Sequence, residues 1–258
     1  MKRIFLAILL CSAIAVSAQQ PPKVVHVFVA LADNQNQGIV PVPARLGNGE
    51  DSERNLYWGA AGGIKTYFRR SSEWTLLQSG QKPKSEVLER CIFKHRTKNV
   101  YVVADAYRGR EIRQAILDFL VSAAGEGAEA VTVPSASNPV TISTRGGANV
   151  AVYIGHDGFM DFHLPLLPRK KNEIRREAIV LACASKSYFA DAIRTSGAYP
   201  LLWTTNLMAP EAYTLKSALD GWVEGESNEQ IRNRAAAAYD RYQKCGLRAA
   251  RKLLVSGW

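Results

Sequence analysis

The sequence predicts an α/β fold, a three-layer sandwich in which a mainly parallel sheet lies between two layers of helices. Short apolar runs rich in β-branched residues alternate with segments of helical periodicity along the chain. Several of these runs are apolar at every position, which is typical of parallel strands buried on both faces. The chain has 258 residues without internal repeats or a distinct linker, a length that suits one large domain. We therefore expect a single α/β domain over residues 19–258.

The first 18 residues have the composition of a secretory signal peptide. Met1, Lys2 and Arg3 give a positively charged start, residues 4–10 are apolar, and small residues precede Ala18. We expect cleavage after Ala18 and export to the periplasm or the extracellular space. No later segment approaches the ~20 apolar residues that a membrane helix requires, so no membrane span is expected.

The first half of the remaining chain predicts four strands and two helices. Residues 23–31 form an apolar first strand, and a polar loop at residues 33–38 leads into irregular chain as far as about Ser52, where Pro and Gly recur. Asn55 is the expected cap of a helix that reaches Phe68. Further strands are expected at residues 74–77, 88–94 and 99–105, and the apolar face of residues 112–120 predicts an amphipathic helix.

The second half continues the alternation of strands and helices. Residues 125–147 are small and polar, with a short strand expected at residues 131–133. Strands are then expected at residues 149–155, 178–182 and 200–205. Helices are expected at residues 186–195, from Pro210 to Gly225, and as a long tail over residues 228–256. This alternation predicts helices on both faces of the sheet.

Two of the expected strands end on a reactive side chain. The run at residues 149–155 precedes His156, and the run at residues 178–182 precedes Cys183. Ligands of open α/β sheets bind at the carboxyl ends of the strands, so an imidazole and a thiol on neighbouring strands would share one site. An imidazole can activate a thiol nucleophile and supply the proton for a departing amine. The backbone N–H groups of Gly158 and Cys183 are the expected oxyanion donors.

These segments resemble the clan CD caspase-like cysteine peptidases, which include caspases, gingipains, legumain, separase and CHAT domains. In that family one buried strand leads into His-Gly and the next into the catalytic Cys, and residues 152–158 and 180–185 are similar. The resemblance covers roughly residues 99–225. It implies a caspase-like fold and a cysteine endopeptidase that cleaves a protein or peptide substrate through an acyl-enzyme, without a cofactor. Cys183 would be the nucleophile and His156 the general acid, although Asp157 separates His156 from Gly158 here.

Polar residues near the expected site are candidates for substrate binding. The loop after the first strand offers Asp33, Asn34, Gln35 and Asn36, and the loop after His156 offers Asp157 and Asp161. The carboxylates would favour a basic residue before the scissile bond. His163 is an alternative partner for Cys183. The same loop could hold a metal ion, but its spacing matches no established zinc motif, so no metal is expected.

Charge and cysteine content limit the other function classes. The chain has a formal net charge of +10, but its basic residues are dispersed and no recognition motif is present, which favours a solvated basic surface over nucleic-acid binding. Cys91, Cys183 and Cys245 follow the signal peptide. An odd number leaves at least one thiol unpaired, and a Cys91–Cys245 disulfide would leave Cys183 free.

Two alternatives to a peptidase remain from the sequence. The first is a catalytically inactive caspase-like domain that binds a partner or acts as a scaffold, in which Cys183 is a buried core residue. The second is another α/β hydrolase or transferase that uses the same thiol.

Overall fold

The computed structural model describes residues 21–135 and 138–258. The predicted signal peptide, residues 1–18, lies outside the described residues. In chain order the elements are β1 (Lys23–Ala30), α1 (Ile64–Arg69), β2 (Trp74–Gln81), β3 (Val87–His95), β4 (Val100–Tyr107), η1 (Gly109–Glu111), α2 (Ile112–Ala123), β5 (Glu129–Val133), β6 (Val140–Thr144), η2 (Arg145–Gly147), β7 (Val150–Ile154), η3 (Gly158–Met160), β8 (Glu177–Leu181), α3 (Ser185–Ser196), β9 (Tyr199–Thr204), α4 (Ala212–Val223), α5 (Asn228–Gln243), α6 (Leu247–Leu253) and β10 (Leu254–Val255).

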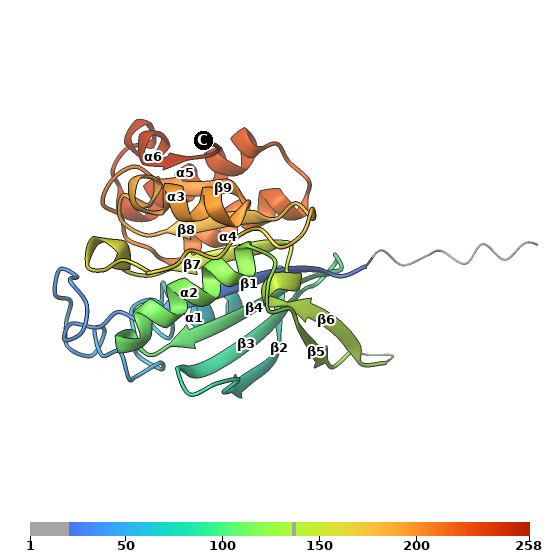
Figure 1. The fold of residues 1–258 in the computed structure, drawn as a ribbon. Coiled ribbons are helices and arrows are strands. Elements are labelled where there is room, and N and C mark those ends of the chain that lie inside the picture. The colour runs from blue at the N-terminus through green and yellow to red at the C-terminus, as the bar shows by residue number, and fades with distance from the viewer. Residues whose placement is uncertain (1–20, 136–137) are drawn as a thin grey trace, which may run out of the picture.

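One eight-stranded sheet forms the centre of the molecule (Figure 1). Its strand order is β10-β9-β8-β7-β1-β4-β3-β2. The five strands from β9 to β4 are parallel, whereas β10 at one edge and β3 and β2 at the other run antiparallel to their neighbours. All residues of β4 and β7 are buried, as expected for strands covered on both faces. The predicted α/β fold with a mainly parallel sheet is confirmed.

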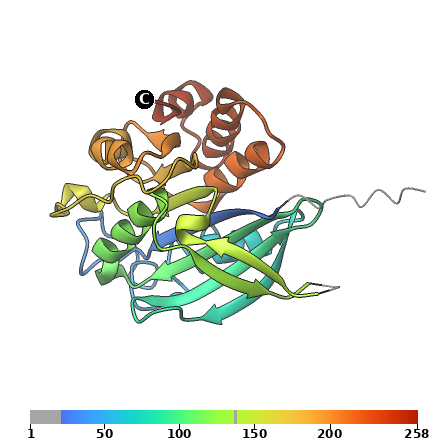
Figure 2. The ribbon, with the colours of Figure 1, turned by 45° about the vertical axis from the view of Figure 1, so that its right-hand side comes forward.

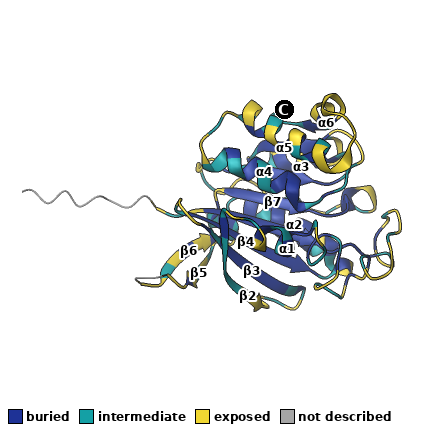
Figure 3. Cartoon of the chain, turned by 180° about the vertical axis from the view of Figure 1, so that it is seen from behind, coloured by how far each residue is buried: buried dark blue, intermediate teal, exposed yellow. Residues whose placement is uncertain are grey.

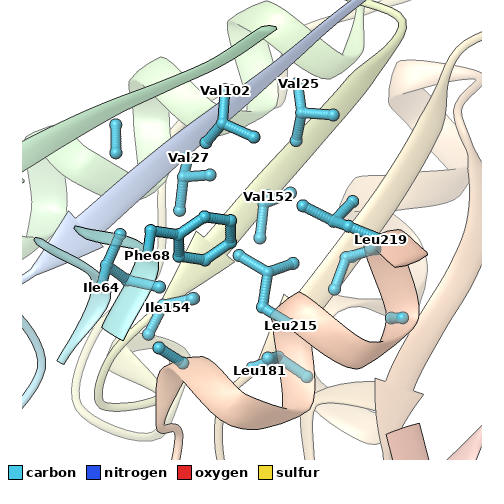
Figure 4. Close-up of a cluster of buried hydrophobic side chains, with 14 of the residues drawn as sticks. Val25, Val27, Ile64, Phe68, Val102, Val152, Ile154, Leu181, Leu215 and Leu219 are labelled. Atoms are coloured by element: carbon cyan, nitrogen blue, oxygen red, sulfur yellow. The ribbon is translucent and has the colours of Figure 1, made fainter. Parts of the chain in front are cut away.

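Helices cover both faces of this sheet, so the architecture is compatible with a three-layer sandwich (Figures 1 and 2). On one face Ile64 and Phe68 of α1 and Leu215 of α4 pack on strand residues such as Val152 (Figure 4). On the other face α2 and α3 contribute a second buried cluster that includes Phe119, and the sheet strands between the helical layers are almost wholly buried (Figure 3). None of the described helices is both long and apolar enough to span a bilayer.

The β5–β6 hairpin extends the layer that contains α2. Its Val133 and Ile142 are fully buried and belong to one apolar cluster with residues of β1, β3 and β4. A buried ion network also ties it to the sheet, because the Arg90 guanidinium bonds both to Asp105 of β4 (2.6 and 2.8 Å) and to Glu129 of β5 (2.9 Å). Asp105 Oδ2 lies 3.1 Å from His26 Nε2. Neither β6 nor this network is predicted by the sequence pattern.

The helix predicted over residues 55–68 is wrong in its first half. Residues before Ile64 form turns, and only residues 64–69 are helical. A Cβ atom at Gly59 would lie 2.0 Å from the Glu53 carbonyl oxygen, and one at Gly63 would lie 2.4 Å from the Trp58 backbone. The glycines therefore allow the chain to fold back tightly on itself.

The C-terminal helical tail is also divided. The helix α5 ends at Gln243 and is followed by Lys244 in the left-handed conformation (φ 53°); α6 and the short edge strand β10 follow. Cys91, Cys183 and Cys245 are all free thiols; Cys91 is buried and Cys245 is exposed. The Cys91–Cys245 disulfide considered above is therefore not formed.

Candidate functional site

The structure brings His156 and Cys183 to the same end of two adjacent strands. β7 and β8 are parallel neighbours, and Ile154 at the end of β7 is in register with Leu181 at the end of β8. His156 and Cys183 each lie two residues beyond these positions. Both residues line one cavity of about 320 Å³. An imidazole and a thiol thus share one site at the carboxyl edge of the sheet, where α/β proteins generally bind their ligands.

Cys183 lies in a tight connection between β8 and α3. The next residue, Ala184, has φ 46° and ψ 30°, a left-handed conformation that costs a non-glycine residue about 1 kcal/mol. Ala184 N–H bonds to the Asn206 carbonyl at 2.9 Å, and Ser185 N–H bonds to Thr204 Oγ1 at 3.1 Å. These bonds fix the turn, so the half-buried Cys183 side chain faces the cavity.

The thiol contacts the backbone of Met208. Cys183 Sγ accepts a hydrogen bond from Met208 N–H at 3.4 Å and lies 3.6 Å from the Met208 carbonyl oxygen, to which S–H donates. Among the described residues, His156 is not a hydrogen-bond partner of this sulfur. The Cys183 backbone N–H bonds to none of the described backbone groups.

His156 is oriented by Asp161. The imidazole is almost buried, and its Nε2 lies 2.8 Å from Asp161 Oδ2. The Asp161 carboxylate accepts a hydrogen bond from Nε2–H, so that Nδ1 of the ring carries the lone pair. Asp161 Oδ2 also accepts the Gly38 N–H at 3.2 Å. Asp161 is a substrate-binding candidate by its sequence position, whereas its contacts in the structure position the histidine.

Asp157 and Gly158 lie behind the cavity rather than in its wall. Asp157 is fully buried, its Oδ1 accepts the Phe159 N–H at 3.0 Å, and its Oδ2 has no hydrogen-bond partner among the described residues. Burial, with a smaller contribution from the Asp161 charge, raises the pKa of Asp157 to about 7. A Cβ atom at Gly158 would lie 2.7 Å from the Phe162 ring. Neither residue is among those lining the cavity, and an oxyanion role for Gly158 stays a prediction.

The polar loop after β1 forms its own internal bonds. Asp33 accepts hydrogen bonds from Gln35 N–H at 2.9 Å and from the Asn36 side chain at 2.8 Å, and Asn34 pairs with the backbone of Val42. The cavity is lined not by these residues but by Gly38, Ile39, Val40 and Val42, which follow them. The loop therefore shapes one wall of the cavity.

His163 is exposed and does not line the cavity. Its carbonyl oxygen accepts a bond from Arg113 at 2.8 Å. The described part of the chain contains no group of three or more His, Cys, Asp or Glu side chains arranged to hold a metal ion.

The remaining walls are mainly apolar, and two polar side chains interrupt them. The apolar members are Ile39, Val40, Val42, Leu56, Met160, Leu207, Met208, Ala209 and Pro210. The polar ones are Tyr57 and Glu211, and neither side chain makes a hydrogen bond or ion pair with another described residue. Burial raises the pKa of Glu211. Neither residue is among the candidates predicted from the sequence. The available signal for Glu211 is its place after β9, at the carboxyl edge that also holds Cys183.

Comparisons of the chain with protein-family models, with curated proteins and with solved structures find no match.

Proposed function

We propose that this protein is an exported cysteine endopeptidase of caspase-like type, with Cys183 as nucleophile and His156 as general acid and base. The observation that carries the proposal is the cavity that Cys183 and His156 both line at the ends of adjacent parallel strands. The left-handed residue directly after the thiol supports it, because strained backbone often accompanies a nucleophile displayed between a strand and a helix.

The geometry supports an acyl-transfer mechanism. Cys183 Sγ attacks the carbonyl carbon of the scissile bond while its proton passes to His156 Nδ1, and Asp161 stabilises the resulting imidazolium through Nε2. The Cys183 N–H donates to the developing oxyanion. His156 then protonates the departing amine as the C–N bond breaks, which leaves a thioester on Cys183 that water hydrolyses. The thiol leaves its Met208 contacts before it attacks.

The cavity favours a side chain with an aliphatic stem and a cationic end. Its walls are largely apolar, and Glu211 supplies a carboxylate that no described cation neutralises. A basic side chain would pack its methylene groups on those walls and pair its charge with Glu211. The preference that the sequence suggested for Asp33, Asp157 and Asp161 is thus reassigned to Glu211.

The test is covalent labelling of the mature protein by a peptidyl electrophile that carries Lys or Arg next to its reactive carbonyl. Labelling should occur on Cys183, should be absent in Cys183→Ala, and should slow at least a hundredfold in His156→Ala. Cys245→Ala is the matched control, because Cys245 is an exposed thiol that is not among the residues lining the cavity. Folded protein that is labelled only on Cys245 would contradict the proposal.

One observation favours the alternative of a catalytically inactive caspase-like binding or scaffold domain. The hydrogen-bond contacts of the thiol are with Met208 and not with His156. If that arrangement is permanent, simple alkylating agents should modify Cys183 no faster in wild type than in His156→Ala.

A further inference from the structure

A second cavity, of about 830 Å³, adjoins the first and shares Glu211 with it. It lies on the face of the sheet covered by α1, α4 and α5, and residues of all three helices line it. We call it the tyrosine cleft, because Tyr67, Tyr213 and Tyr242 form part of its wall. Apart from the shared Glu211, no residue of this cleft has a part in the proposed function.

The three tyrosines form a packed surface. The rings of Tyr213 and Tyr242 are stacked, with centroids 4.2 Å apart and an interplanar angle of 5°. The Tyr67 ring meets both of them edge-on, and its hydroxyl lies 3.1 Å from that of Tyr242. Tyr213 is buried, whereas Tyr242 is exposed and Tyr67 is partly exposed. Accessible aromatic rings with hydroxyl groups at their edges bind peptide chains well, because they bury much area at little cost in side-chain entropy.

Basic side chains outnumber acidic ones in the lining of the cleft. Lys216 is paired with Glu73 and Asp220, each at 2.9 Å. A hydrogen bond from Ser71 and the pairing with Lys216 lower the pKa of Glu73 to about 2, so that this carboxylate is ionised. In contrast, the guanidinium groups of Arg70 and Arg241 make no hydrogen bond or ion pair with any residue of the described chain. Two free guanidinium groups therefore line one cavity, where they can bind a carboxylate.

We infer that the tyrosine cleft is a subsite for an acidic residue of the peptide substrate, bound by Arg70 and Arg241. The inference rests on the proposed function, since it places a neighbouring basic residue of the same peptide in the cavity of Cys183. Glu211 lines both cavities, so they lie next to each other, and a peptide advances roughly 3.5 Å per residue when extended. The preferred substrate thus carries a basic residue at the scissile bond and an acidic residue close to it in sequence.

The test is the anisotropy of labelled peptides bound to the full mature chain carrying Cys183→Ala, which removes turnover. One peptide carries Lys followed or preceded by Glu, and its partner carries Gln in place of Glu. We expect the Glu peptide to bind about tenfold more tightly at low salt, with a smaller advantage at 0.5 M salt. Arg70→Gln combined with Arg241→Gln should abolish the advantage. Arg69→Gln, an adjacent exposed residue outside the cleft lining, should preserve it.

The outcomes separate this inference from the proposed function. Equal affinity for the two peptides, or an equal loss in Arg69→Gln, would overturn the acidic subsite even if Cys183 is labelled as a peptidase. A preference for the Glu peptide over the Gln peptide that is lost when Arg70 and Arg241 are replaced would support the subsite even if Cys183 proves unreactive. Inorganic phosphate that binds through these arginines, without any preference for the Glu peptide, would overturn the assignment to a peptide in favour of a small anion.

Discussion

Asp161 orients His156, with its Oδ2 2.8 Å from the imidazole Nε2 and the same oxygen accepting the Gly38 N–H. The carboxylate thus connects the loop after β1 to the ring that faces the Cys183 cavity. It provides a negative charge where the imidazolium forms during proton transfer. Asp161 and Asp157 are close in sequence but have different environments, one partly exposed and paired, the other buried with an unpaired oxygen.

Asp161→Asn should slow labelling of Cys183 by a peptidyl electrophile about tenfold to a hundredfold. The amide retains the shape of the side chain but removes the charge that stabilises the imidazolium. The readout is the second-order rate constant of labelling across pH 5–9, together with the melting temperature, which should change little because Asp161 is partly exposed. Asp191→Asn, an exposed carboxyl of α3, is the control. A wild-type rate and pH profile in Asp161→Asn would refute the positioning role.

Asp157→Asn should stabilise the protein at pH 8. The pKa of the Asp157 carboxyl is about 7 in the folded protein and ~4 in the unfolded chain. The protonated carboxyl therefore contributes its full share of stability below pH ~4, and this contribution is lost as the pH rises through 7. By this linkage the loss is on the order of 4 kcal/mol at most. The stability difference between wild type and variant, measured by urea unfolding, should therefore grow between pH 4.5 and 7 and then level off. A pH-independent difference would show that Asp157 does not titrate in this range.

Ala184→Gly should stabilise the protein by about 1 kcal/mol, because glycine adopts the left-handed conformation without the steric cost of a Cβ atom. Ala190→Gly, inside the regular part of α3, should destabilise it by ~0.5–1 kcal/mol. Denaturant unfolding of the two variants checks the opposite signs. If both variants lose the same amount of stability, the backbone at Ala184 is not strained.

Glu211→Gln should reduce the preference for a basic residue at the scissile bond at least tenfold. The neutral amide cannot pair with a cation in a cavity whose walls are mainly apolar. The measurement compares labelling rates of electrophiles that carry Lys, Gln or Leu at that position. The Leu reagent is the internal control and should react with variant and wild type at similar rates. An unchanged ratio of Lys to Leu would remove Glu211 from the recognition of substrate.

Asp105→Asn should lower the free energy of unfolding by about 3–5 kcal/mol, because it leaves the buried Arg90 charge only partly compensated. Although burial opposes ionisation, hydrogen bonds and charge from Arg90 and His26 hold the pKa of Asp105 well below its usual range. A lowered folded pKa contributes stability above pH ~4 that disappears as the carboxylate is protonated in acid. The variant should therefore approach wild type in stability as the pH falls below 4, as unfolding free energies would reveal.

Strands could be predicted from the sequence where apolar runs are long and uninterrupted. The parallel strands β1, β4, β7, β8 and β9 follow from such runs, and the placement of His156 and Cys183 at one sheet edge follows from their neighbouring order. The turns before α1 could not be predicted in the same way. Gly59 and Gly63 serve close backbone approaches there, which helical periodicity does not reveal.

The details of the site depend on contacts between distant segments. Asp157 and Asp161 are equivalent in a sequence pattern, and only the path of η3 buries one and turns the other towards His156 and Gly38. Glu211 gains its role from a cavity assembled by five separate segments of the chain. Likewise, Arg90 pairs with Glu129 only because the β5–β6 hairpin folds onto the sheet.

Because β7 and β8 lie in the middle of the sheet, backbone amide hydrogens in these strands should exchange with solvent more slowly than those in the cavity walls. These strands are buried along nearly their whole length, so their amide protons should exchange with solvent only through global unfolding. The cavity walls include Val40 and Leu207, which are 84% and 70% exposed, and amides there should exchange through local opening. A ligand can therefore reshape the walls within milliseconds while the thiol and the imidazole keep the spacing set by the sheet.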